Sequence, residues 1–252
     1  MIQSVRTAAA GMRAEQERLD NIASNIANVN TVAYKSVRTD FKDALYNSIT
    51  DPVGGSEENN LTRGAGVIAN GTNRNFSTGV DRETEGKLDF MLEGKGFFTL
   101  QDSGGQTLYT RNGNFSLSAE NGNTYLVNGD GYYVMSDTGK RISLSTNDDI
   151  TVDAGGTIFS NGARTANFAI AEFPNQTGLS DVGDSCFMET QASGGAARAE
   201  APNVMQGSLE SSNVDLAQEM TLMIRTQRAY TMASKALQTA DDMDGLANNM
   251  RG

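Results

Sequence analysis

Both ends of this 252-residue chain carry the hydrophobic spacing of long amphipathic helices, and the sequence between them does not. At residues 1–30 and about 209–252, apolar side chains recur every three or four positions, which places them on one face of an α-helix. A long helix with a narrow apolar stripe needs a partner in water. Two such helices can pair with each other and then with further copies, which indicates a subunit built to assemble more than an enzyme.

Within both terminal segments the large apolar residues fall seven positions apart, the a/d repeat of a coiled coil. Polar Gln16 interrupts the N-terminal row, and Ile224 widens the C-terminal row. Each large side chain buried in such a seam stabilises it by roughly 1.5–3 kcal/mol. The predicted assembly interface consists of Val5, Met12, Leu19 and Ile26 at one end, and Leu216, Met220, Met223, Tyr230 and Leu237 at the other.

Asparagines form a second stripe on the N-terminal helix. Asn21, Asn25 and Asn28 are spaced i, i+4, i+7 and are either a solvated face or side chains that hydrogen-bond a neighbouring helix and fix its register. Asn28 and Asn30 are expected to end the helix, because Asn side chains compete for backbone hydrogen bonds.

For the C-terminal helix, the N-cap candidates are Ser211, Ser212 and Asn213, with Asp215 in the first turn where a carboxylate favours the helix dipole. Six of the chain's eleven methionines lie from Met205 onward. They are either ordinary core filling or flexible side chains that adapt to several different neighbours.

The middle of the chain changes character twice. Residues from about 39 to 82 are polar and irregular, and a loop of that length is uncommon unless it is functional or disordered. From about residue 88, short apolar runs alternate with turn dipeptides that tolerate the positive φ of type I′ turns. Hairpins are predicted at Asn112-Gly113, Asn121-Gly122, Asn128-Gly129 and Asp130-Gly131.

These patterns predict an α+β fold in which the N- and C-terminal helices pair as a coiled coil, beside a β-rich central domain and an extended arm. The predicted divisions are 1–36, the N-terminal helix and an Asn-rich motif; 37–82, the arm; 83–206, the β-rich domain; and 207–252, the C-terminal helix that pairs with 1–30.

Composition excludes several classes of function. A net charge of −11 makes nucleic acid an improbable partner, because no basic stripe exists to release counterions. The chain has no histidine, which rules out His-based triads and zinc sites built on His. No secretory signal or membrane-length apolar stretch is visible, so we predict no membrane insertion. These signals alone place the chain in the cytoplasm, unless an export route reads its uncleaved N-terminus.

No cofactor or metal site is predicted. Residues 64–69 match G-x-G-x-x-A in letters but lack the preceding buried strand and following helix that a dinucleotide loop requires. The adjacent acids Asp148-Asp149 and Asp241-Asp242 point apart in regular structure, and the second pair lacks calcium-loop spacing, so both are interpreted as solvated. The single Cys186 cannot form an intramolecular disulfide and is interpreted as a small, semi-buried residue.

Several segments resemble the rod and hook family of bacterial flagellar axial proteins. The first runs from Asn25 to Ser36, with Ala33 where the family pattern has glycine. The residues that carry this motif are Asn25, Asn28, Asn30, Thr31, Tyr34 and Lys35. Further segments that resemble the family are Leu92–Phe98, Tyr109–Phe115, Leu209–Asp215 and Gln227–Asp241.

The resemblance implies a non-enzymatic subunit of the flagellar basal-body rod, exported uncleaved through the flagellar type III apparatus. Such a subunit self-assembles into a helical tube that transmits torque from motor to hook and is needed for motility. The implied partners are further copies, other rod and hook subunits, the export apparatus and surrounding ring proteins, with no cofactor.

Within the family, Leu45–Pro52 and Gly64–Val67 resemble the extra stretch of the distal rod subunit. The proximal rod subunit is the close alternative, and hook subunits are usually longer. Outside the family, two alternatives stay open. One is a carboxylate-dependent wall hydrolase that brings two acids together from separate strands. The other is a soluble coiled-coil adaptor that stays in the cytoplasm.

Overall fold

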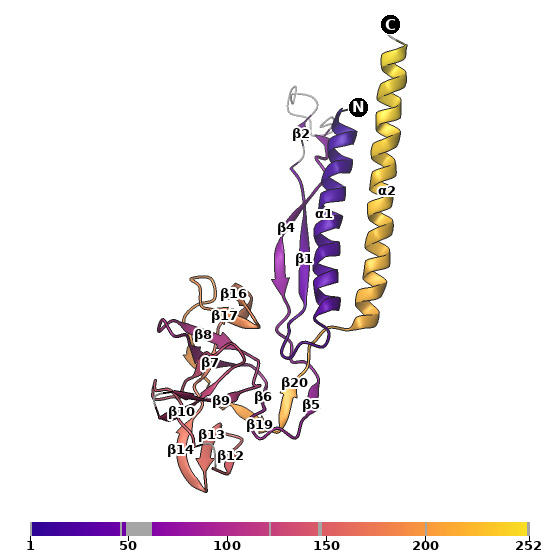
Figure 1. The fold of residues 1–252 in the computed structure, drawn as a ribbon. Coiled ribbons are helices and arrows are strands. Elements are labelled where there is room, and N and C mark those ends of the chain that lie inside the picture. Colours follow the sequence, from indigo (N-terminus) through magenta and orange to yellow (C-terminus); the bar gives the residue numbers. More distant parts are fainter. Residues whose placement is uncertain are drawn as a thin grey trace. The chain divides into compact units, whose positions relative to one another are not determined.

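The computed structural model describes residues 2–45, 47–48, 62–120, 122–145, 148–199 and 201–250. These residues form two compact units, and the chain passes between them more than once. Unit 1 comprises Met1–Ala27, Val37–Arg74 and Asp215–Gly252, and unit 2 comprises Asn28–Ser36 and Asn75–Val214. The predicted α+β class, with terminal helices around a β-rich middle, is confirmed (Figure 1).

Unit 1 is built from two long helices and a two-stranded ribbon. Helix α1 (Ile2–Ala27) and helix α2 (Leu216–Asn249) lie side by side and run in opposite directions (Figure 1). Strand β1 (Val37–Asp43) pairs antiparallel with β4 (Val67–Arg74), and both contact α1. A two-stranded ribbon is at best marginally stable in water, so its contact with α1 is what holds it.

Farther along this ribbon, the short strand β2 (Asn47–Ser48) pairs with β3 (Thr62–Arg63). The stretch Leu45–Pro52, which resembles the distal rod subunit, lies largely outside the described residues.

Helix α1 ends where the asparagines predict, and the turn after it contains an alanine in a left-handed backbone conformation. The helix stops at Ala27, and residues 28–30 form a turn. Ala33, which occupies the glycine position of the motif, nevertheless adopts a left-handed backbone with φ 57° and is fully buried. This conformation costs an L-residue roughly 1–2 kcal/mol. The Ala33 amide donates to the Glu210 carbonyl at 2.8 Å, a bond that helps to hold the turn.

The N-cap of α2 is Asp215, beyond the predicted candidates Ser211, Ser212 and Asn213. Its Oδ1 atom accepts backbone hydrogen bonds from the second and third helical residues at 3.0 and 3.2 Å. A carboxylate at this position satisfies two orphan N–H groups and complements the helix dipole, which is why the helix begins there.

Replacing Asp215 with alanine is expected to lower the free energy of unfolding of unit 1 by about 1 kcal/mol, because two helical N–H groups lose their acceptor. Denaturant unfolding followed by far-ultraviolet circular dichroism would measure the loss. Asp242→Ala, an exposed change near the other end of α2, is the matched control and should leave stability unchanged or slightly raised. Equal losses in the two variants would contradict the capping role.

Unit 2 is β-rich. Its largest sheet has nine strands in the order β16 (Ser180–Gly183), β17 (Cys186–Met188), β8 (Thr107–Thr110), β7 (Phe97–Gln101), β11 (Tyr133–Val134), β10 (Asn123–Val127) and β9 (Ser116–Glu120), with β15 (Ile170–Glu172) pairing with β7 and with β18 (Ala197–Arg198). A second sheet contains β12 (Ile150–Val152), β13 (Thr157–Ser160) and β14 (Ala163–Asn167). Two small pairs join β5 (Asp81–Glu83) to β20 (Ser208–Glu210) and β6 (Phe90–Glu93) to β19 (Asn203–Gln206). A 3₁₀ turn, η2, spans Gln176–Gly178.

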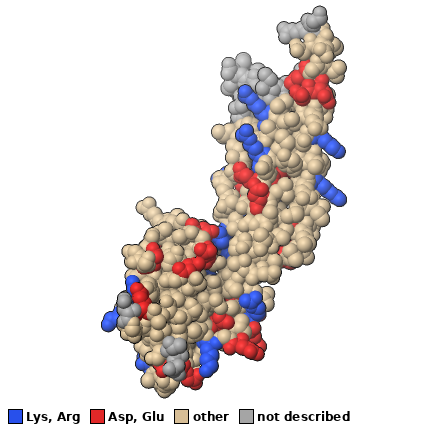
Figure 2. Space-filling model, viewed as in Figure 1, with Lys and Arg blue, Asp and Glu red and all other residues tan. Residues whose placement is uncertain are grey.

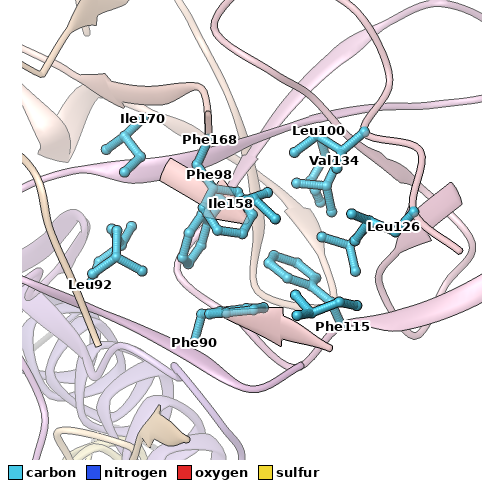
Figure 3. Packing of buried hydrophobic residues seen from close by; sticks show 14 of the residues in the cluster. Phe90, Leu92, Phe98, Leu100, Phe115, Leu126, Val134, Ile158, Phe168 and Ile170 are labelled. Atoms are coloured by element: carbon cyan, nitrogen blue, oxygen red, sulfur yellow. The ribbon is translucent and has the colours of Figure 1, made fainter. Parts of the chain in front are cut away.

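The core of unit 2 is aromatic at its centre. Phe90, Phe98 and Phe115 pack with Phe168, and the rings of Phe98 and Phe168 meet edge to face at 5.3 Å (Figure 3). Edge-to-face pairs of this kind add roughly 0.5–1.5 kcal/mol beyond their buried area. Unit 2 therefore has a hydrophobic core of its own.

The four predicted turn dipeptides lie in three regions of the chain. The hairpins at residues 121–122 and 128–132 are confirmed, and the hairpin at residues 112–113 is not. Strands β9 and β10 pair across residues 121–122, where Gly122 has φ 84° and Asn121 lies outside the described residues. Strands β10 and β11 pair across residues 128–132. Asn112-Gly113 does not join a hairpin, because β8 pairs with β7 and β17 instead. A Cβ at Gly113 would lie 1.8 Å from the carbonyl oxygen of Phe90, so this glycine permits a close backbone approach.

Cys186 lies in the core of unit 2 and is 1% exposed, more deeply buried than predicted. Burial raises the pKa of its thiol to about 11. The folded protein favours the protonated thiol. The stability that this preference contributes is therefore fully present below the ordinary pKa of a cysteine thiol. That contribution is lost as pH rises towards about 11.

The native Cys186 thiol should therefore react with iodoacetamide at pH 8 at least about 100-fold more slowly than in denaturant, because it is both buried and protonated. Mass spectrometry of timed samples would measure the two rates. Native labelling at the denatured rate would contradict the buried position.

Candidate functional site

The predicted assembly residues occupy unit 1, and most are half-buried. Half-buried positions are Val5, Met12, Leu19 and Ile26 on α1 and Met223, Tyr230 and Leu237 on α2. Two predicted members are exposed, Leu216 at 38% and Met220 at 51%. On α2, the half-buried members of the predicted row begin at Met223.

The most deeply buried residues of α2 are polar. Glu219 is 0% exposed and Thr226 is 2% exposed. Glu219, Met223, Thr226 and Tyr230 are spaced by four, three and four residues, and Leu237 follows seven residues later. All five therefore lie on one side of α2. A search for apolar residues alone passes over Glu219 and Thr226. The spacing itself is the signal that identifies them.

Among the described residues of unit 1, Glu219 forms an ion pair with Arg38. Its Oε1 lies 2.7 Å from Nη2 of Arg38 on β1, and the Arg38 side chain is 39% exposed. Neither carboxylate oxygen of Glu219 receives a well-aligned hydrogen bond, so the contact is ionic in character. A buried carboxylate held in this way depends on its cation, because its desolvation is compensated only while the pair persists.

The asparagine stripe of α1 binds the ribbon. The Asn25 side chain donates to the Val37 carbonyl and accepts from the Val37 amide, both at 2.9 Å. Asn21 donates to Thr39 Oγ1 at 2.7 Å. Asn21 and Asn25 are therefore neither a solvated face nor a contact to a neighbouring helix. They fix the register of β1 on one side of α1, and helical periodicity turns the Val5–Ile26 row to a different side.

The remaining motif residues lie in or near the turn that follows α1. Asn28 and Tyr34 are half-buried, Asn30 and Thr31 are exposed, and Lys35 is buried. Asn28 accepts a hydrogen bond from the Thr31 hydroxyl at 3.1 Å.

The glycine pattern at residues 64–69 has a packing role. Gly66, with φ 105°, lies against α1, where a Cβ would come 3.3 Å from Thr7 Cγ2. The pattern then continues into strand β4, not into a helix. This is the context of a ribbon crossing a helix closely, in agreement with the expectation that it is not a dinucleotide loop.

A buried ion cluster lies within unit 2, and we call Lys35, Arg111 and Glu210 the ion cluster. The Lys35 Nζ lies 2.5 Å from Glu210 Oε1, and the Arg111 Nη1 lies 3.7 Å from Glu210 Oε2. All three side chains are at most 1% exposed. One carboxylate thus serves two buried cations.

Neutral carbonyls also accept hydrogen bonds from both cations. Arg111 donates to the carbonyls of Leu92 at 3.1 Å and Gly94 at 2.5 Å, and its guanidinium lies 5.5 Å from the ring centroid of Phe97. Lys35 also donates to the Ser77 carbonyl at 2.7 Å. Burial lowers the pKa of Lys35 and of Arg111, and the charge of Glu210 opposes that shift in both.

Four separate sequence motifs meet at this cluster. Lys35 closes the first motif, Leu92 and Gly94 belong to the second, Arg111 to the third and Glu210 to the fourth. All four segments were identified in the sequence by their resemblance to the family, and Lys35 was among the motif residues. The sequence did not predict that the four segments are in contact. Their meeting depends on pairings between residues far apart in the chain, such as the 175 positions between Lys35 and Glu210.

Asn213 ties three chain segments together beside the cluster. Its Oδ1 accepts from the Ser36 amide at 2.8 Å, and its Nδ2 donates to the carbonyls of Asn75 at 2.8 Å and Ser77 at 3.1 Å. The amide of Asn213 donates to the Tyr34 carbonyl at 3.3 Å. The arrangement clamps the chain where it enters and leaves unit 2, which is a structural task and involves no bond-breaking chemistry.

The predicted acid pairs stay on the surface of their elements. Asp148 accepts from Ser160 and from Asn161, and those hydrogen bonds, the one from Ser160 foremost, lower its pKa. Asp241 and Asp242 are exposed on α2. Within the described ranges, no group of three or more His, Cys, Asp or Glu side chains is placed to hold a metal ion. No helix there is long and apolar enough to span a membrane.

Three family descriptions match the chain. "Flagella basal body rod protein" matches residues 5–35, "Flagellar hook protein FlgE/F/G D1 domain" matches 91–160, and "Flagellar basal body rod FlgEFG protein C-terminal" matches 205–250. These ranges contain Lys35, Arg111 and Glu210 respectively.

Full-length relatives share the similarity. The flagellar basal-body rod protein FlgG of Caulobacter vibrioides is 36% identical over 269 residues, covering 99% of this chain and 100% of the relative. FlgG of Borreliella burgdorferi is 36% identical over 268 residues, with 100% and 99% covered. FlgG of Agrobacterium fabrum is 37% identical over 268 residues, with 98% of each chain covered.

Proposed function

This chain belongs to the family of flagellar basal-body rod proteins, and we propose that it is the distal rod subunit, which self-assembles into a helical tube that transmits torque from motor to hook. Its place is the flagellar basal body, and its role is that of a structural rod subunit in motility. The observation that carries the proposal is the identity of 36% across 99% of the chain to a rod protein of nearly equal length.

The assembly interface of this proposal is the helix pair of unit 1. We infer that α1 and α2 pair as a coiled coil, with the Val5–Ile26 row packed on the Met223–Leu237 row. The half-buried state of both rows and the four-three spacing of the buried α2 stripe support this inference. The division of the chain at residues 36, 82 and 206 stays a prediction.

The partners follow from family membership at the level of other rod and hook components. We further propose contacts with copies of the same chain and with surrounding ring proteins, and export through the flagellar type III apparatus. We propose no catalytic role, no cofactor, no nucleic-acid partner and no membrane insertion. A zymogram on cell-wall substrate would test the hydrolase alternative, and cell fractionation would test the cytoplasmic adaptor.

Electron microscopy of basal bodies from a strain that lacks this chain tests the function directly. A rod that stops short, without hook or filament, is expected, and its length would separate a distal from a proximal subunit. Re-expression of the chain should restore complete rods. Complete basal bodies in the deletion strain would contradict the proposal.

A further inference from the structure

Asparagine followed by glycine is a chemically reactive pair, and this chain contains several such pairs. The backbone nitrogen of the glycine can attack the asparagine side chain, because glycine has no Cβ to obstruct the approach. The pairs are Asn70-Gly71, Asn112-Gly113, Asn121-Gly122, Asn128-Gly129 and Asn161-Gly162. Asn121 lies outside the described residues. The other pairs are alike at the reacting residues but differ in their surroundings in the fold.

Asn128 is buried and firmly held, since it is 6% exposed. Its Nδ2 donates to Asp130 Oδ2 at 3.0 Å, and its Oδ1 accepts from the backbone amides of Asp130 at 3.0 Å and Tyr132 at 2.9 Å. These hydrogen bonds fix the side chain within the turn between β10 and β11. The Asn128 side chain must break all of them before its carbonyl carbon can meet the nitrogen of Gly129, which requires local unfolding.

Asn161 and Asn112 are restrained by hydrogen bonds of their own. The Asn161 side chain is exposed but tied at both ends, since Oδ1 accepts from the Asp149 amide at 3.0 Å and Nδ2 donates to Asp148 Oδ1 at 2.9 Å. The Asn112 Oδ1 accepts from the Asn114 amide at 3.0 Å. In both pairs, hydrogen bonds that the folded chain makes have to be broken before the glycine nitrogen can be reached.

Asn70 is placed differently, in the ribbon of unit 1. It lies in strand β4, which pairs with β1 (Figure 1). Asp40 pairs with Gly71 and Phe41 pairs with Ala69, so Asn70 is the extra residue of a β-bulge and has no partner in the ladder. Asn70 and Gly71 are both exposed. The reacting pair therefore lies in water, at a place where the regular strand pairing is interrupted.

The side chain of Asn70 is free to turn. Among the described residues, none forms a hydrogen bond with it. A Cβ placed on Gly71 would have no described atom within 4 Å, so the space beside this glycine is open. An adjacent glycine, an unbound side chain and access to water thus meet at Asn70. They do not meet at Asn112, Asn128 or Asn161.

We propose that Asn70 is a site of spontaneous deamidation in the folded chain, which converts it to aspartate and isoaspartate. The Gly71 nitrogen forms a bond to Cγ of Asn70 as the bond from Cγ to the side-chain nitrogen breaks, and ammonia leaves with the proton of the Gly71 amide. Water then opens the resulting five-membered imide. Cleavage at Cγ gives aspartate, and cleavage at the main-chain carbonyl gives isoaspartate. The reaction consumes only water and does not depend on the proposed rod function.

Either product changes the charge of the ribbon. Strands β1 and β4 carry three basic and two acidic residues, which are Arg38, Lys42, Arg74, Asp40 and Asp43. One added carboxylate turns this excess of one positive charge (3 − 2 = 1) into balance (3 − 3 = 0). Acidic and basic side chains both lie over unit 1 on the face shown in Figure 2, so the conversion alters a surface of mixed charge. Isoaspartate also adds one carbon to the main chain within β4.

Timed incubation of the purified full-length chain tests the site. Samples are kept in mildly alkaline buffer, either native or in denaturant, and peptide mass spectrometry measures the conversion at each Asn-Gly pair. Isoaspartate is confirmed with protein isoaspartyl methyltransferase and labelled S-adenosylmethionine. In the native chain, Asn70 is expected to convert at least about tenfold faster than Asn128 and Asn161, because those two must first lose side-chain hydrogen bonds. In denaturant the rates should converge, since the fold no longer distinguishes the pairs.

Two variants identify the reacting group. Asn70→Gln keeps an amide but places it one methylene farther out, where the five-membered ring cannot form, so conversion in the ribbon should stop. Asn123→Gln, the same change at an exposed position of β10, should leave conversion at Asn70 as fast as in the unaltered chain. A native rate at Asn70 no faster than at Asn128 and Asn161 would overturn the proposal. A preference for Asn70 that persists in denaturant would also overturn it, because the fold would then not be its cause.

Discussion

Replacing Glu210 with glutamine is expected to lower the free energy of unfolding of unit 2 by about 3–5 kcal/mol. The substitution keeps the side-chain shape but removes the carboxylate that lies 2.5 Å from Lys35 and 3.7 Å from Arg111. The two buried cations then lose the anion that they share, and their mutual repulsion is compensated less, although the charge of Glu172 still favours the charged form of Arg111. Unit 2 itself should therefore lose stability.

The Cys186 thiol offers a direct readout of this loss. It lies in the core of unit 2, so its alkylation under native conditions reports the fraction of molecules in which unit 2 is open. A change of about 3–5 kcal/mol corresponds to at least a hundredfold faster native labelling where opening limits the reaction. Denaturant unfolding followed by circular dichroism provides an independent value.

The exposed pair Lys87–Asp149 supplies the matched control. Its atoms meet at 2.8 Å, but the two side chains are 71% and 67% exposed. Asp149→Asn should change stability by less than about 1 kcal/mol, since water already solvates both charges. If Glu210→Gln costs no more than Asp149→Asn, the ion cluster does not hold the four motifs together.

Lys35→Met should be milder than Glu210→Gln. Glu210 would keep Arg111 at 3.7 Å, and the backbone amide of Gly79 also donates to its Oε1 at 2.8 Å. Replacing a buried ionic group with an apolar one of similar length removes its desolvation cost together with its attraction. A larger loss of unfolding free energy in Glu210→Gln than in Lys35→Met would therefore show that the anion is the critical member of the ion cluster.

Local spacing was sufficient to predict the elements of this fold that depend on neighbouring residues. The seven-residue rows gave the two terminal helices, and Asn28 to Asn30 gave the end of α1. Positive-φ dipeptides gave the turns between β9, β10 and β11. Each of these features is decided within about ten residues of chain, so the sequence pattern carries the information.

Features decided by distant residues could not be predicted in this way. The hairpin expected at Asn112-Gly113 was wrong because Gly113 instead meets the backbone of Phe90, far from it in sequence. Ala33 adopts a left-handed turn that the alanine disfavours, and the bond to the Glu210 carbonyl contributes to holding it there. The ion cluster likewise appears only when four distant segments are folded together.

The buried side of helix α2 shows a third kind of difficulty. Apolar spacing located Met223, Tyr230 and Leu237, but the most buried members of the stripe are Glu219 and Thr226. Polar residues in a helix contact are costly unless partnered, so sequence reasoning ranks them low. Arg38, which partners Glu219, lies on the ribbon, and nothing in the α2 sequence reveals it.

Introducing aspartate at Leu237 of α2, or at Leu19 of α1, is expected to abolish rod assembly while unit 2 stays folded. Both leucines are half-buried on the predicted rows. Each change removes an apolar contact worth roughly 1.5–3 kcal/mol and places a carboxylate where it is partly desolvated. The described part of unit 1 consists of two helices and the ribbon, which must absorb that loss, whereas unit 2 keeps its own aromatic core.

Two measurements separate the effects on the two units. Electron microscopy of basal bodies in the complemented deletion strain should show no complete rods for either variant. Native Cys186 labelling of the purified variants should stay as slow as in the unaltered chain, because Cys186 belongs to unit 2. Ala236→Asp, an exposed change next to Leu237, should assemble normally. Complete rods with Leu237→Asp would contradict the α1–α2 helix pair as the basis of assembly. Rapid Cys186 labelling in either variant would show that the two units do not fold independently.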